Sequence, residues 1–84
     1  MGLTEDFQSA VGRSKQLPEK PSNDDLLKLY SLYKQATVGD VSGDKPGLFD
    51  FVAKAKYEAW EKVQGTTPEE AMQQYVALVD GLEG

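Results

Sequence analysis

Helical periodicity, interrupted by proline and glycine, is the feature that most constrains the fold of this chain. Four stretches repeat apolar residues at intervals of three and four, as amphipathic helices do, and no stretch alternates like a half-buried strand. Pro18 and Pro21 separate the first stretch from the second, and a glycine-rich segment over residues 39–47 separates the second from the third. The pattern predicts an all-α fold, a four-helix up-down bundle with a long loop between helices two and three.

Side chains that cap helices predict where the helices begin. We expect the first helix to begin near Thr4 and the second at Ser22, because each hydroxyl can accept a hydrogen bond from the first turn. The fourth helix has the clearest start, since Thr67 is followed by Glu70 in the capping-box position. The third helix is expected over residues 48–63 from its apolar spacing.

The apolar stripe of each helix is expected to face the core. The stripe of the second helix contains Leu26, Leu29, Tyr30, Tyr33 and Thr37. The stripe of the third contains Leu48, Val52, Ala55, Ala59 and Val63, with Phe49 and Trp60 beside it. Gly39 and Gly65 are expected to end these two helices, because glycine adopts the left-handed conformation at little cost.

Size and composition limit the chain to one small domain with little catalytic chemistry. Its 84 residues suit a single domain, expected to span 1–84. The chain has no cysteine and no histidine, which excludes disulfides, Ser-His-Asp catalysis and most zinc sites. No carboxylate pair is spaced in a way that demands catalysis. We therefore expect no enzymatic activity, no cofactor and no metal.

Charge and hydropathy limit the partners. A net charge of −5 disfavours nucleic acid, whose phosphates attract basic proteins. Apolar runs fall far short of the ~20 residues that span a bilayer, and the first residues lack the basic and apolar regions of a signal peptide. We expect a cytoplasmic monomer that makes at most transient contact with membranes.

Three lysines lie on or beside the apolar stripes. On a helical wheel, Lys56 falls roughly 40° from Val52, inside the apolar arc. Lys34 and Lys15 lie at the edges of their arcs. An ammonium in such a place must reach water or meet an anion, because burying it unpaired is costly. Either each lysine extends its head to solvent, or the three frame one pocket for an anionic ligand.

Two sequence blocks carry a resemblance to a known family. The first runs from Tyr30 to Asp40 and has the sequence YSLYKQATVGD. The second begins with KPG at Lys45 and ends with KAKYEAW at Trp60. The chain resembles the acyl-CoA-binding proteins, small four-helix carriers of fatty acyl-coenzyme A esters, over essentially its whole length. It departs at Ser14, where an apolar residue is usual, and this serine is expected to loosen the packing against helix four.

The resemblance implies a role for each unusual lysine. It assigns acyl-CoA binding to residues of several helices: Lys15, Tyr30, Ser31, Leu32, Tyr33, Lys34, Lys56 and Tyr75. Tyr30, Lys34 and Lys56 would hold the 3′-phosphate, while Tyr33 would lie against the adenine. The acyl chain would occupy a groove between helices two and three, along Leu26, Leu27, Val52 and Ala55. The implied partners are medium- to long-chain fatty acyl-CoA and, transiently, the enzymes that use it.

Two other functions remain compatible with the sequence. A helical protein-interaction module would use the same surface without a small ligand, and a general lipid binder would lack specificity for coenzyme A. An enzyme acting on CoA esters would need a nucleophile and a base that the sequence does not offer. Thermal stabilisation by the ester, by free coenzyme A and by free fatty acid distinguishes these alternatives.

Overall fold

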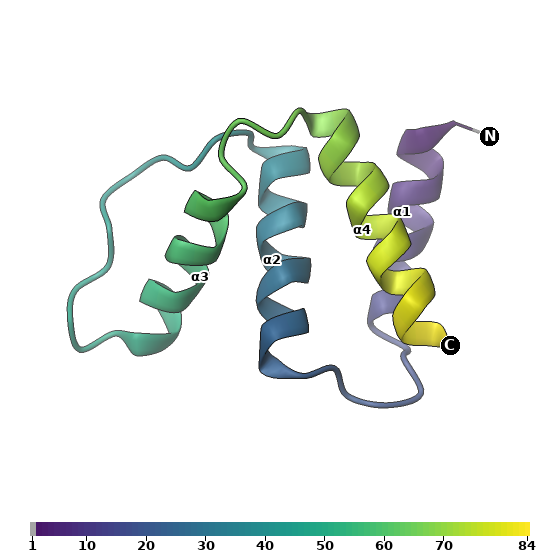
Figure 1. Cartoon of the computed structure of the whole chain (residues 1–84), viewed down its shortest axis with the longest axis horizontal. Coiled ribbons are helices and arrows are strands. Elements are labelled where there is room, and N and C mark those ends of the chain that lie inside the picture. The colour runs from purple at the N-terminus through teal and green to yellow at the C-terminus, as the bar shows by residue number, and fades with distance from the viewer. Residues whose placement is uncertain (1) are drawn as a thin grey trace.

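The computed structural model describes residues 2–84, and this part of the chain contains four helices and no strand (Figure 1). The helices are α1 (Leu3–Ser14), α2 (Asn23–Thr37), α3 (Phe51–Lys62) and α4 (Pro68–Glu83). Helix α2 packs against both α3 and α4, and α1 packs against α4. The predicted all-α, four-helix fold is confirmed.

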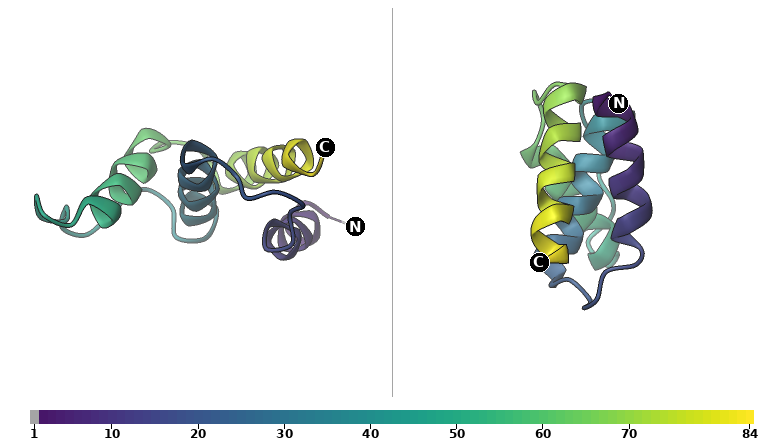
Figure 2. Two further views of the ribbon diagram at one scale, coloured as in Figure 1. Left: turned by 90° about the horizontal axis from the view of Figure 1, so that it is seen from below. Right: turned by 90° about the vertical axis from the view of Figure 1, so that its right-hand side faces the viewer.

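The long loop determines the direction of α3. Helices α2 and α3 run the same way in Figure 1, and α1 and α4 run the opposite way. The loop over residues 38–50 returns the chain along the length of α2, so the up-down alternation is interrupted at this one connection. Seen from below, α3 occupies one end of an elongated molecule of 40 × 28 × 15 Å (Figure 2).

Local capping explains where the helices begin. The hydroxyl of Ser22 accepts a hydrogen bond from the N–H of Asp25 at 3.1 Å, and that of Thr67 accepts one from Glu70 at 3.1 Å. Both predicted starts are confirmed. The first helix begins close to the predicted place, at Leu3, but the predicted cap at Thr4 is wrong, because Gly2 occupies the N-cap position without a side-chain bond.

Helices α1, α2 and α4 supply most of the core. The buried cluster consists of Phe7, Ala10, Leu29, Leu32, Ala36, Ala71, Tyr75 and Val79. The ring of Phe7 meets the ring of Tyr75 edge-on, with 5.1 Å between centroids. In α4, the buried residues Ala71, Tyr75 and Val79 recur every fourth position, as one helix face requires.

The predicted core face of α3 is wrong in its first half. Leu48, Phe49 and Val52 are 72%, 93% and 68% exposed. The helix begins only at Phe51, because the carboxylate of Asp50 caps it by accepting a hydrogen bond from the N–H of Ala53 at 3.3 Å. Helix α3 packs on α2 alone among the helices of residues 2–84, so it has one neighbour to bury a stripe against.

Four hydrogen bonds fix the end of α2. The amide nitrogen of Gln35, a residue only 1% exposed, donates to Asp40 Oδ1 and to the carbonyl of Thr66, both at 2.8 Å. Asp40 Oδ1 also accepts a hydrogen bond from the N–H of Gly65 at 2.9 Å. The indole N–H of Trp60 donates to the carbonyl of Gly39 at 2.8 Å. Together these bonds hold the end of α2 against the end of α3 and the turn into α4.

Candidate functional site

Aromatic and basic residues from α1, α2 and α4 surround a shallow depression of about 260 Å³. Its lining comprises Val11, Ser14, Lys15, Leu29, Tyr30, Tyr33 and Tyr75. A second depression of about 340 Å³ shares Val11 and Tyr33 and continues along α1 to Thr4. Tyr33 stands between the two, 41% exposed, with its ring stacked on Phe7 at 6.0 Å. The part of the Tyr33 ring that Phe7 leaves exposed offers an aromatic surface to a planar ligand group.

A short chain of hydrogen bonds orients the hydroxyl of Tyr75. Ser14 Oγ donates to the carbonyl of Val11 at 2.7 Å, which uses its only hydrogen. The hydroxyl of Tyr75 therefore donates to Ser14 Oγ, at 3.1 Å. Ser14 thus joins α1 to α4 by a hydrogen bond, a different result from the expected loss of packing.

The two lysines of the proposed phosphate site each cover an aromatic ring. The ammonium of Lys34 lies 5.0 Å from the centre of the Trp60 ring, and that of Lys56 lies 5.3 Å from the centre of the Tyr30 ring. Each contact joins α2 to α3. Neither ammonium pairs with a carboxylate of residues 2–84. Each ammonium therefore lies on a ring face and has hydrogen-bond donors available for an anion.

An apolar groove of about 400 Å³ lies between α2 and α3. It is lined by Asn23, Leu26, Leu27, Phe51, Val52, Ala55 and Lys56. All four residues predicted for an acyl groove lie along it. Phe51 also lines it, although the predicted set omits this residue. Lys56 belongs both to this groove and to the contact with Tyr30, so the apolar and cationic surfaces meet at one side chain.

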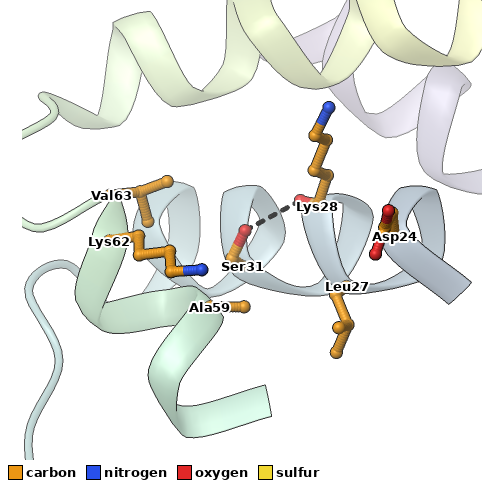
Figure 3. Close-up of a pocket in the computed structure, with 7 residues that line it drawn as sticks. All are labelled: Asp24, Leu27, Lys28, Ser31, Ala59, Lys62 and Val63. Carbon is orange, nitrogen blue, oxygen red and sulfur yellow. Dashed lines mark hydrogen bonds between the residues drawn. The ribbon is translucent and has the colours of Figure 1, made fainter. Parts of the chain in front are cut away.

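Two of the predicted binding residues lie elsewhere. Leu32 is 6% exposed and belongs to the core. Ser31 is 2% exposed, and its hydroxyl donates to the carbonyl of Lys28 at 3.0 Å. Ser31 lines a separate depression of about 440 Å³ against α3, where the side chains of Lys28 and Lys62 point in different directions (Figure 3). This depression brings no cationic cluster together.

Comparison with known proteins identifies the family. The sequence profile of a family described as "Acyl CoA binding protein" matches residues 4–79. The chain belongs to the acyl-CoA-binding protein family. Two relatives of this family member are an acyl-CoA-binding protein of Gossypium hirsutum and one of Saccharomyces cerevisiae, each 50% identical. The alignments cover 98% and 90% of this chain and 92% and 87% of the relatives.

A longer relative and two solved structures extend the comparison. Acyl-CoA-binding domain-containing protein 3 of Oryza sativa is 51% identical, and this chain spans only 54% of its length. The crystal structure of Oryza sativa acyl-CoA-binding protein 2 matches with a TM-score of 0.92 and 46% identity, over 96% of this chain and 90% of that one. A crystal structure from Moniliophthora perniciosa matches with a TM-score of 0.85 and 45% identity, over 93% and 76%. The family's fold is therefore shared along nearly the whole chain.

A metal site and a membrane span would each need an arrangement that residues 2–84 lack. Within this range, no group of three or more carboxylates is arranged to hold a metal ion. None of the described helices combines the length and the hydropathy that crossing a bilayer requires.

Proposed function

We propose that this protein binds medium- to long-chain fatty acyl-CoA esters and carries them without chemical change. The observation that carries the proposal is the meeting of the apolar α2–α3 groove with the cationic, aromatic surface at Lys56. A fatty acyl-CoA has one part that suits each surface. Its hydrocarbon chain suits the apolar groove, and its phosphorylated nucleotide suits the cationic, aromatic surface. Membership of the acyl-CoA-binding protein family supports the same ligand.

The nucleotide end would be held by residues that the structure leaves without carboxylate partners. Lys34 and Lys56, with the hydroxyl of Tyr30, would bind the 3′-phosphate through charge-assisted hydrogen bonds. Tyr33 would stack on the adenine, while Lys15 and Tyr75 would complete the nucleotide pocket. Because the net charge of −5 repels a polyanion at long range, these local cations must act within about 8 Å, the Debye length at physiological salt.

The acyl chain would supply much of the affinity. Leu26, Leu27, Val52 and Ala55 line the groove that would receive it. Each buried methylene contributes about 0.8 kcal/mol, so ten sheltered methylenes contribute at most about 8 kcal/mol before the entropy of association is subtracted. Ser31 and Leu32, both buried, would contribute by packing within α2 and would not contact the acyl chain. A cytoplasmic location, a monomeric state and transient contact with acyl-CoA-using enzymes stay predictions.

Isothermal calorimetry with palmitoyl-CoA, free coenzyme A and palmitate tests the proposal. We expect the ester to bind most tightly, because only the ester occupies both surfaces. Equal binding of ester and palmitate would indicate a general lipid binder. Absence of saturation with any of the three would favour a protein-interaction module and overturn the proposal.

Lys56→Ala, with Lys54→Ala as its matched control, tests the cationic site. Lys54 lies two residues away on α3 and lines none of the depressions described above. Loss of a charge-assisted bond costs about 1.5–3 kcal/mol. The ester affinity of Lys56→Ala should therefore fall by about tenfold to a hundredfold, while Lys54→Ala should bind as the unaltered protein does. Equal affinities of the two variants would contradict the site.

A further inference from the structure

Large apolar side chains are exposed together at the turn before α3 and in its first turn. Phe49 is 93% exposed, and Leu48, Phe51 and Val52 are 72%, 73% and 68% exposed. We call these four residues the apolar tip. Exposed apolar residues scattered singly are ordinary, but four within one short segment mark an interaction surface.

The apolar tip lies at a free end of the molecule. Figures 1 and 2 show the loop and the start of α3 at one end, on the far side of α2 from α1 and α4. Asp50, the one charged residue between the tip residues, turns its carboxylate to the N–H of Ala53. The charge is thus engaged with the start of the helix, and α2 separates the tip from α1 and α4.

The apolar tip is continuous with the α2–α3 groove. Phe51 and Val52 belong to the tip and also line the groove. Leu48 and Phe49 do not line the groove, and they directly precede Asp50 and the two shared residues in the chain. The two shared residues therefore place the exposed apolar surface of the tip next to the apolar lining of the groove.

Charge around the tip suits an electrically neutral surface as the partner. The chain as a whole carries a net charge of −5, yet residues 44–58 contain equal numbers of lysines and carboxylates. Lys45 and Glu58 in this segment form an ion pair at 3.3 Å. The segment around the tip is neutral overall, so its own charge does not oppose approach to a phospholipid surface despite the net charge of −5.

We propose that the apolar tip docks on a phospholipid bilayer, with Leu48 and Phe49 inserted at the interface. In this position the groove opens toward the leaflet, and an acyl chain moves between bilayer and groove without crossing water. The transfer of an acyl chain into the groove rests on the proposed function, but the docking itself is measured without any acyl-CoA.

A fluorophore at the tip tests the docking directly. The chain has no cysteine, so Phe49→Cys gives a single site for an NBD label. Val38→Cys is the matched control, because Val38 is also exposed, at 56%, and lies at the opposite end of α2 from the groove. With phosphatidylcholine vesicles, emission from position 49 should rise and shift to the blue, and emission from position 38 should not. Unchanged emission at position 49, or equal changes at both positions, overturns the proposal.

The double variant Leu48→Ser/Phe49→Ser tests what the docking does. Compared with Val38→Ser, it should take up palmitoyl-CoA from vesicles about tenfold more slowly, because two bilayer-inserted apolar groups are lost. Its affinity for decanoyl-CoA dissolved as a monomer should stay within about twofold, since neither residue lines the groove. An equal fall in both quantities would make the tip part of the groove, and an unchanged uptake rate would point to a protein partner; either result overturns the proposal. Failure of the unaltered protein to bind dissolved ester would instead refute the proposed function, while the fluorescence result would stand.

Discussion

Tyr75 buries its ring against Phe7, yet its hydroxyl keeps an acceptor in Ser14. Ser14→Ala removes that acceptor and leaves a part-buried phenol without its partner. An unsatisfied buried hydroxyl costs about 1–3 kcal/mol, so urea denaturation should show a loss of this size in the free energy of unfolding. In a Tyr75→Phe background, the same serine substitution should cost much less, because the bond is already absent. Equal costs in both backgrounds would show that Ser14 acts independently of Tyr75.

The places of some single residues could be predicted from the sequence, and those of others could not. The four groove residues and the group Lys15, Tyr30, Tyr33 and Tyr75 were predicted, and the structure brings each set together. The hydrogen bond of Ser14 was not predicted, because it joins residues 61 positions apart and depends on how α1 meets α4. Sequence spacing also gave no sign that Ser31 and Leu32 face away from the tyrosines toward α3 and the core.

Between elements, Asp40 joins the end of α2 to the turn before α4. The backbone N–H of Gly65, followed by the amide of Gln35, holds the pKa of this carboxyl below its usual value. A carboxyl whose pKa is lower in the folded protein stabilises the fold above its unfolded pKa of about 3.9, and this contribution is lost as the pH falls through the folded pKa. As the pH is lowered below about 4, the melting temperature of Asp40→Asn should therefore fall less than that of the unaltered protein. Parallel pH profiles would show that the carboxylate adds nothing to this contact.

Helix α3 shows which features of an element are local and which are not. Caps at Ser22 and Thr67 were predictable because each depends on residues within one turn. The low burial of α3 was not predictable, because its apolar spacing does not reveal that α2 is the one helix of residues 2–84 that packs against it. The same spacing that usually marks a core face here marks a groove wall and an exposed tip.

In the whole molecule, three helices form a packed unit to which α3 is attached. The main buried cluster comes from α1, α2 and α4, whereas Trp60 is the one residue of α3 in the buried class. An element with few buried contacts opens locally at a lower free energy than the global unfolding of the protein. Helix α3 nevertheless supplies Val52, Ala55 and Lys56 to the proposed ligand surface. The proposed ligand would therefore join the least anchored helix to the packed unit.

Hydrogen exchange of the backbone amides can detect this coupling. Opening of α3 alone would break the proposed ligand site, so at a ligand concentration of 100 Kd exchange in α3 should slow by up to about a hundredfold. Fraying at the end of α4, near Asp80 and Glu83, leaves the site intact and should be little changed by palmitoyl-CoA. Free coenzyme A lacks the acyl chain, so it should protect the first turn of α3, near Val52, less than the ester does. Equal slowing in α3 and at the end of α4 would mean that the ligand stabilises the protein only globally, and that α3 does not open independently of the packed unit.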